Sequence, residues 1–211
     1  MDEQAEATAR AYDSAALDFA DRTSERSALA SEFFDLFLDT LEPGSRVGDL
    51  GCGPGHDLRR LLSAGHRAVG VDRSPGLLAL CPVASECVLG DLRALPVAEG
   101  SLEAIWSSAA LLHIDSSDIA ATFAEWDRVL VPGGTVGFAT SLGGDEGWEL
   151  MPAGPGRRPE IAAGHQRWFV HHTEQALRAA VADVGWTIES SVVRESTRSW
   201  VQIIAATVPA V

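Results

Sequence analysis

The sequence lacks the features that mark secreted, membrane-spanning and metal-binding proteins. It has three cysteines, Cys52, Cys81 and Cys87, and none of them belongs to a Cys-x-x-Cys pair. An odd number without paired spacing argues against a disulfide framework or a zinc site, so we predict reduced thiols and no metal. The acidic N-terminus has no apolar segment typical of a signal peptide, and no run of about 18 apolar residues occurs. We therefore expect a cytoplasmic protein with no membrane span.

Positive charge is also scarce. The chain carries 16 basic and 30 acidic side chains, which gives a formal net charge of −14. A protein this acidic repels phosphate backbones unless it has a local basic patch. The densest basic cluster, Arg157-Arg158, is small. We predict no nucleic-acid partner, and a length of 211 residues favours a single domain over 1–211, as a monomer or homodimer.

The sequence does contain a regular alternation of strand and helix patterns. Five short apolar runs separated by helical patterns predict strands at 46–50, 68–72, 87–89, 102–109 and 135–140. Such alternation is typical of an α/β protein whose parallel sheet is covered by helices on both faces. A helix over 173–184 and strands over 186–193 and 201–208 follow. The connection between these two strands is too short for a crossover helix, so we expect them to pair antiparallel.

Helical periodicity locates the apolar faces of two predicted helical segments. Residues 5–41, within an N-terminal cap over 1–42, repeat apolar side chains at helical spacing at Leu29, Phe33, Leu36 and Phe37. The helix after the fourth strand is expected to bury Ile119, Phe123, Trp126 and Leu130 and to end at Pro132-Gly133-Gly134. Residues 143–164 are rich in glycine and proline and show no period. They are either a lid loop over the site or a passive surface insertion.

A glycine-rich turn, Asp49-x-Gly51-x-Gly53-x-Gly55, joins the first predicted strand to a helix. Glycines allow a sharp turn and close approach of a ligand to the backbone, and open α/β sheets bind ligands at the carboxyl ends of their strands. Asp72 ends the second strand, where it could accept hydrogen bonds from ribose hydroxyls. Asp91 ends the third strand and could accept one from an adenine amino group. We expect these residues to surround one pocket.

The glycine spacing separates this pattern from other nucleotide sites. Dinucleotide sites use Gly-x-Gly-x-x-Gly, with a pyrophosphate at the helix N-terminus. Here His56 occupies the third position of that pattern, and Gly55 precedes it. No Gly-Lys-Ser or Gly-Lys-Thr of a phosphate-binding loop occurs either. The pattern therefore favours an adenosine ligand without a phosphate.

The chain resembles class I S-adenosylmethionine-dependent methyltransferases in five segments that occur in family order: 47–55, 69–74, 90–96, 105–113 and 129–134. The resemblance implies a Rossmann-like, doubly wound, mostly parallel sheet of seven strands. It implies the strand order 3-2-1-4-5-7-6, with the seventh strand antiparallel. Gly48 departs from the family pattern, in which a larger apolar residue is usual at this position in the first strand.

The resemblance implies S-adenosylmethionine as the cofactor and S-adenosylhomocysteine as the product. The cofactor-binding residues that it implies are Tyr12, Asp49, Gly51, Cys52, Gly53, Gly55, Asp72, Arg73, Asp91, Leu92 and Ser107. Tyr12 belongs to a segment, Ala11-Tyr12-Asp13-x-x-Ala16-x-x-Phe19, that folds over the cofactor in many small-molecule members. Ordinary packing is the alternative for Tyr12, and also for Cys52.

Methyl transfer from a sulfonium depends mainly on positioning, and a general base is needed only if the acceptor must lose a proton. His113 follows the fourth strand and is the candidate catalytic base, with strand-end packing as the alternative. A metal site at His171-His172 is not favoured, because adjacent residues of an extended chain face opposite ways. Ring and guanidinium side chains that could either line an acceptor pocket or pack elsewhere are Trp148, Arg167, Trp168 and Phe169.

Three functions remain open from the sequence. The first is methyl transfer from S-adenosylmethionine to a small-molecule acceptor. The second is a regulatory or scaffold protein that binds S-adenosylmethionine without catalysis. The third, a nicotinamide-dependent oxidoreductase, is disfavoured by the glycine spacing and by Asp91.

Overall fold

The computed structural model describes residues 3–24, 28–151, 165–196 and 198–209. Its main sheet has seven strands in the order β3-β2-β1-β4-β5-β9-β8. The strand bounds are β1 Arg46–Leu50, β2 Arg67–Asp72, β3 Cys87–Leu89, β4 Leu102–Ser108, β5 Leu130–Ser141, β8 Thr187–Glu195 and β9 Ser199–Ala206. This order confirms the predicted one, with β8 and β9 as the sixth and seventh strands.

Strand direction determines where a ligand site can form. Strands β3, β2, β1, β4 and β5 are mutually parallel, whereas β9 is antiparallel to both β5 and β8. The carboxyl ends of the five parallel strands therefore lie along one edge of the sheet. The turns that follow β1, β2 and β3 meet at this edge, as ligand sites in open α/β sheets require.

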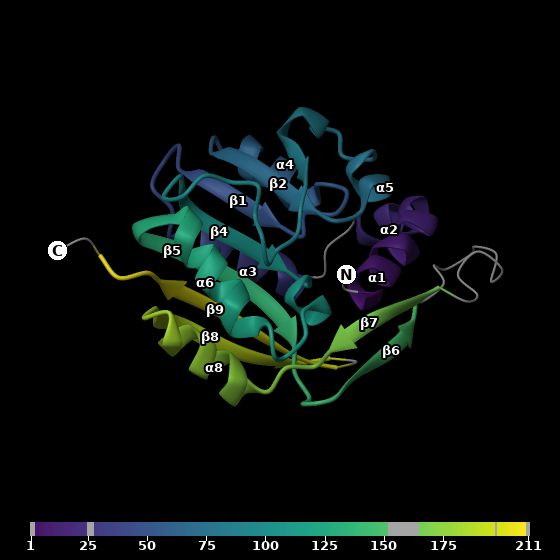
Figure 1. Ribbon diagram of the computed structural model, residues 1–211. Coiled ribbons are helices and arrows are strands. Elements are labelled where there is room, and N and C mark those ends of the chain that lie inside the picture. The colour runs from purple at the N-terminus through teal and green to yellow at the C-terminus, as the bar shows by residue number, and fades with distance from the viewer. Residues whose placement is uncertain (1–2, 25–27, 152–164, 197, 210–211) are drawn as a thin grey trace.

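Helices cover both faces of the sheet, as the alternation predicts. Their bounds are α1 Glu3–Ser14, α2 Ala16–Thr23, α3 Ala28–Leu38, α4 His56–Ser63, α5 Pro75–Leu78, α6 Ile119–Val129 and α8 Glu174–Asp183. Figure 1 shows α6 and α8 on the near face of the sheet and α3 behind it. The described part of the chain contains no helix both long and apolar enough to cross a membrane.

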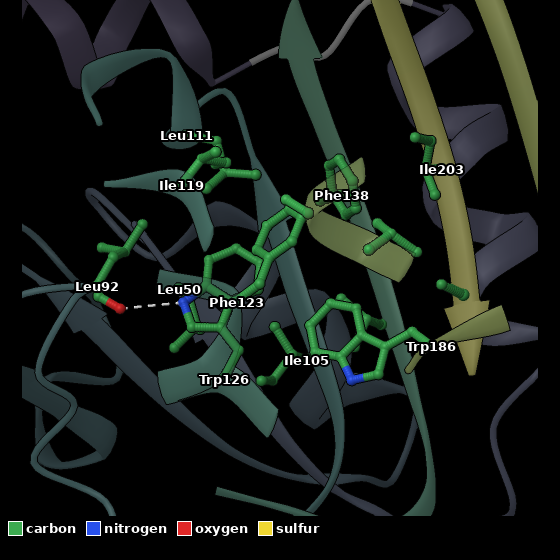
Figure 2. Packing of buried hydrophobic residues seen from close by; sticks show 14 of the residues in the cluster. Leu50, Leu92, Ile105, Leu111, Ile119, Phe123, Trp126, Phe138, Trp186 and Ile203 are labelled. Atoms are coloured by element: carbon green, nitrogen blue, oxygen red, sulfur yellow. Dashed lines mark hydrogen bonds between the residues drawn. The ribbon is translucent and has the colours of Figure 1, made fainter. Parts of the chain in front are cut away.

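The core on the α6 and α8 face is built on large aromatic rings (Figure 2). Phe123 stacks on Trp186 with ring centroids 5.3 Å apart. The indole N–H of Trp126 donates to the backbone oxygen of Leu92 at 3.1 Å. A buried indole N–H needs a partner, so this bond ties the loop after β3 to the core. Leu92 is thereby held at the carboxyl edge of the sheet.

The opposite face is centred on Trp106 of β4. Its ring is 5.1 Å from Phe33 and 5.0 Å from both Phe34 and Phe37, measured between centroids. Its indole N–H donates to Oδ2 of Asp57 at 2.8 Å. Trp106 thus joins α3 to the start of α4, directly after the glycine-rich turn.

Two helix predictions need correction. The segment 5–41 is helical as predicted and is divided into α1, α2 and α3, but on α3 Phe34 is fully buried whereas Leu36 is 48% exposed. The side chain of Leu29 lies outside the described residues. Leu130 does not end a helix: α6 stops at Val129, and β5 begins at Leu130 and runs through Pro132-Gly133-Gly134. The pairing of β5 with β4 shifts register between Leu102 and Ala104, which accommodates the irregular start of β5.

Residues 146–150 of the segment 143–164, which was expected to be a loop, form a strand. Strands β6 Glu146–Leu150 and β7 Gln166–Val170 pair antiparallel as a separate two-stranded arm, and 152–164 lies outside the described residues. Trp148 and Trp168 face each other across the arm. The backbone N–H of Trp168 donates to Oγ1 of Thr8 at 2.9 Å. This bond holds the arm against α1, and the two lie side by side in Figure 1.

The division into buried and exposed helix positions can be tested with two equal truncations. Leu177→Ala in α8 removes a fully buried side chain, whereas Leu36→Ala in α3 removes one that is 48% exposed. We expect Leu177→Ala to lower the free energy of unfolding by about 2–5 kcal/mol, because it leaves a cavity. Leu36→Ala should change it by about 0.5 kcal/mol or less. Denaturant unfolding followed by circular dichroism measures both, and equal losses would contradict this assignment.

Candidate active site

The glycine-rich turn requires glycine for two different reasons. Gly51, Gly53 and Gly55 have φ values of 78°, 53° and 77°, in the left-handed region that favours glycine. A Cβ on Gly51 would also lie 2.2 Å from the Cβ of Ala110, so the turn packs directly on the loop after β4. A Cβ on Gly55 would lie 2.3 Å from Sγ of Cys81. Gly55 therefore packs behind the turn, whereas Gly51 and Gly53 line cavities at the sheet edge.

The carboxylate of Asp72 ties the turns after β1 and β2 together. Oδ2 accepts the backbone N–H of Gly53 at 2.8 Å, and Oδ1 accepts that of Ser74 at 2.8 Å. Burial raises the pKa of Asp72 above its ordinary value, although these N–H groups oppose the shift. Each oxygen retains a second lone pair. Asp72 can therefore hold the turn and accept hydrogen bonds from a ligand at the same time.

Asp91 lies between two guanidinium groups. Its Oδ2 is 2.8 Å from Nη1 of Arg73 and 2.8 Å from Nη2 of Arg93. Burial alone would raise the pKa of Asp91, but the hydrogen bonds and positive charge of Arg93, with the charge of Arg73, lower it below the ordinary value. Its Oδ1 also accepts the backbone N–H of Arg93 at 2.9 Å and the Nε–H of Arg93 at 3.1 Å. Asp91 is thus held ionised at the end of β3, and a ligand amino group would replace one of these bonds.

These residues line a first cavity of about 150 Å³ at the carboxyl edge of the sheet. The structure brings together here eight of the residues predicted to form the site, namely Tyr12, Gly51, Gly53, Asp72, Arg73, Asp91, Leu92 and His113. The side chain of Ser107, which was also predicted at the site, is fully buried and donates to the backbone oxygen of Leu50 at 2.9 Å. The next residue, Ser108, lines the cavity instead.

A second cavity of about 490 Å³ adjoins the first. The two share five lining residues, Phe19, Gly51, Gly53, Ser108 and Ala109. Asp49 and Cys52, which were predicted at the site, line this second cavity. Residues that the sequence analysis did not identify also line it, notably Arg22, Phe33, Asp57, Arg194, Trp200 and Gln202. They come from α2, α3, α4, β8 and β9, and no local motif connects elements so far apart in the chain.

A chain of hydrogen bonds with a fixed direction runs along the wall of the first cavity. Nη1 of Arg167 donates to the hydroxyl of Tyr12 at 3.0 Å, and that hydroxyl lies 2.9 Å from Nε2 of His113. Nδ1 of His113 lies 2.6 Å from the backbone oxygen of Trp168. A carbonyl oxygen only accepts, so the proton of neutral His113 is on Nδ1, and Nε2 accepts from Tyr12. Both ring nitrogens of the predicted catalytic base are thus engaged.

Burial favours the neutral form of His113. Removal from water lowers the pKa of His113 to about 4, because the charged ring would lose its hydration and the nearby Arg167 repels it. Burial likewise raises the pKa of Tyr12. His113 is therefore neutral near pH 7 and is a weaker base than an exposed histidine.

The other histidine pair has separate partners. His171 lies 3.0 Å from Oγ of Ser141 and 2.9 Å from Oε1 of Glu149, whereas Nε2 of His172 lies 3.0 Å from the backbone oxygen of Leu111. The described residues include no group of three or more His, Cys, Asp or Glu side chains arranged to hold a metal ion. Of the four residues suggested for an acceptor pocket, Arg167 and Trp168 instead contact Tyr12 and His113.

Comparisons with known proteins agree with this geometry. Residues 48–138 match the model of a methyltransferase domain family. A malonyl-[acyl-carrier protein] O-methyltransferase from Dechloromonas aromatica is 42% identical over 100 residues, which cover 45% of this chain and 36% of that protein. An uncharacterised 37.1 kDa protein in transposon TN4556 of Streptomyces fradiae is 33% identical over 133 residues, covering 58% and 36%. The chain spans less than half the length of these relatives.

Solved structures share the fold at low sequence identity. A methyltransferase from Methanosarcina mazei has a TM-score of 0.71 at 18% identity, covering 83% of this chain and 98% of that one. The [4+2]-cyclase SpnF has a TM-score of 0.70 at 17% identity, covering 96% and 95%. Residues 48–138 are therefore similar to a methyltransferase domain, and the strand order is the one that the sequence resemblance to class I S-adenosylmethionine-dependent methyltransferases implies.

The buried His113 generates a prediction about stability against pH. Its folded-state pKa of about 4 is below the ordinary value near 6.5, so between these values the folded protein binds fewer protons than the unfolded chain. Stability should therefore fall as the pH is lowered from about 6.5 to 4, with His113 contributing up to about 1.4 kcal/mol per pH unit. In His113→Gln the contribution of His113 to this pH dependence should disappear. Denaturant unfolding at a series of pH values between about 6.5 and 4 measures it.

Leu177→Ala is the control for the pH series, because it destabilises the protein without removing a titratable group. It should lower the free energy of unfolding by the same amount at every pH and leave the dependence on pH unchanged. A His113→Gln variant with the wild-type slope would mean that His113 is protonated in the folded protein.

Proposed function

We propose that the protein transfers a methyl group from S-adenosylmethionine to a small-molecule acceptor. The observation that carries the proposal is the pair of adjoining cavities at the carboxyl edge of the sheet. The first is lined by the carboxylates of Asp72 and Asp91, and the second is larger and meets it at the glycine-rich turn. One cavity suits an adenosine, and the other leaves room for an acceptor beside it.

The residues of the first cavity fit the adenosine part of the cofactor. Asp72 would accept hydrogen bonds from the ribose hydroxyls through its remaining lone pairs. Asp91 would accept one from the adenine amino group, with Arg73 and Leu92 beside the ring. Tyr12 would close the cavity from α1. Gly51 and Gly53 would let the cofactor pass close to the backbone towards the second cavity.

The amino-acid end of the cofactor fits the boundary of the second cavity. Asp49 is buried at the end of β1 and would attract the ammonium group. Arg22 lies on the same side of α2 as Phe19, with its guanidinium 5.4 Å from the Phe19 ring centroid. Phe19 lines both cavities, so Arg22 is placed to bind the carboxylate of the cofactor. A guanidinium can make two parallel hydrogen bonds to such a group.

The sulfonium of the cofactor supplies the methyl group, and the protein contributes position and exclusion of water. We assign His113 to positioning rather than to proton transfer. Its Nε2 accepts from Tyr12 and its Nδ1 donates to Trp168, so it orients the tyrosine that closes the cofactor cavity. An acceptor that is already ionised needs no general base.

Two alternative functions can each be distinguished from methyl transfer by a specific test. A protein that binds the cofactor without catalysis would bind it but would transfer no methyl group. SpnF, a [4+2]-cyclase of the same fold, illustrates that the fold alone does not determine the reaction. A nicotinamide-dependent oxidoreductase would bind NADH in place of S-adenosylmethionine.

The curated relatives named as malonyl-[acyl-carrier protein] O-methyltransferases make an acyl-carrier-bound acid a candidate acceptor.

Calorimetric titration tests the cofactor assignment. We expect S-adenosylmethionine and S-adenosylhomocysteine to bind the protein in the micromolar range and NADH not to bind. Asp72→Ala should weaken binding of both ligands at least about 100-fold, because it removes the ribose acceptor and releases the N–H of Gly53. Asp39→Ala, which removes an exposed carboxylate at the end of α3, is the matched control and should bind like the wild type.

Transfer of the methyl group is measured separately, as release of S-adenosylhomocysteine with a panel of acceptors that includes a malonyl-loaded carrier protein. Product release with at least one acceptor is expected. Binding of NADH without binding of either adenosyl ligand would favour the oxidoreductase. Tight cofactor binding with no turnover on any acceptor would favour the non-catalytic alternative.

A further inference from the structure

The second cavity carries two arginines from separate elements, Arg22 on α2 and Arg194 on β8. Nε and Nη2 of Arg22 and Nε of Arg194 are buried and have no hydrogen-bond partner among the described residues. The only ion pair that the described residues give Arg194 is a long one, with its Nη2 3.7 Å from Oε2 of Glu32. A buried N–H without a partner costs free energy that a bound anion would recover.

The acidic residues of the same cavity do not neutralise both arginines. Asp57 is at the start of α4, and its Oδ2 accepts the indole N–H of Trp106 at 2.8 Å. Its other oxygen lies 3.9 Å from Nη1 of Arg60. Asp49 is the last residue but one of β1. Both carboxylates therefore belong to the side of the cavity formed by the turn and α4, whereas Arg194 belongs to the side formed by β8 and β9.

The cofactor brings one carboxylate to this cavity, whereas two guanidinium groups line it. Arg22 is the nearer candidate, since it adjoins Phe19 at the junction of the two cavities. Arg194 lies instead with Trp200 and Gln202, which line the second cavity and not the first. With the cofactor carboxylate at Arg22, the guanidinium of Arg194 receives no anion from the cofactor.

We propose that the acceptor carries a carboxylate, and that Arg194 is the residue that selects it. The carboxylate would bind the guanidinium of Arg194, whose planar fork matches it, with the amide of Gln202 nearby. The rings of Trp200 and Phe33 would contact the apolar body of the acceptor. This inference rests on the proposed function, because it assumes that the cofactor occupies the first cavity and the boundary of the second.

The test compares ligands of nearly equal size that differ in charge. The probes are benzoate, phenylacetate and hexanoate, each paired with its amide, titrated into protein saturated with S-adenosylhomocysteine at low salt. We expect at least one carboxylate to bind about tenfold more tightly than its amide. Arg194→Gln should abolish this preference, whereas Arg194→Lys, which keeps the charge, should retain part of it.

Matched control variants distinguish failure of the proposed function from failure of the inference about the acceptor. Arg178→Gln removes an arginine on the surface of α8 and should leave every affinity unchanged. Arg194→Gln should bind S-adenosylhomocysteine as the wild type does and unfold at the same temperature. If the wild type does not bind S-adenosylhomocysteine, the proposed function fails. If it does bind, but none of the carboxylates is preferred or Arg194→Gln keeps the preference, the inference about the acceptor is wrong.

Discussion

The site depends on how closely the backbone at the end of β1 approaches its neighbours. Gly51 leaves no room for a Cβ beside Ala110, and the carboxylate of Asp72 holds the next glycine of the turn through its N–H. These two contacts bring the ends of β1, β2 and β4 together and leave the carboxyl edge of the sheet open above them. Both cavities adjoin this turn, so its shape sets their relative position.

The N-terminal helices and the β6–β7 arm complete the site from outside the sheet. Arg167 and Trp168 of the arm contact Tyr12 and His113, and burial keeps this hydrogen-bonded chain in its neutral histidine form. The arm therefore holds two residues that line the first cavity, Tyr12 and His113, from behind. The second cavity of this acidic protein is lined by two arginines as well as by two carboxylates, those of Asp49 and Asp57.

Sequence motifs predicted the parts of the structure that depend on short stretches of chain. The glycine-rich turn and the convergence of Asp72 and Asp91 follow from motifs within a continuous stretch of chain, whereas the strand order was implied by the family resemblance. Ser107 faces away from the cavity that Ser108 lines, because successive side chains of a strand point to opposite faces. The β6–β7 arm was missed because a glycine- and proline-rich stretch of sequence separates its two short strands, and only their pairing makes them regular. Arg22 and Arg194 were missed because only the tertiary fold brings α2 and β8 to one cavity.

The central claim is that an adenosyl cofactor spans the two cavities across the glycine-rich turn. A crystal structure of the protein with S-adenosylhomocysteine tests it most directly. The account predicts the ribose on Asp72, the adenine beside Asp91 and Leu92, and the amino-acid end between Asp49 and Arg22. Density for the ligand away from Asp72, or an adenosine in the larger cavity, would contradict it.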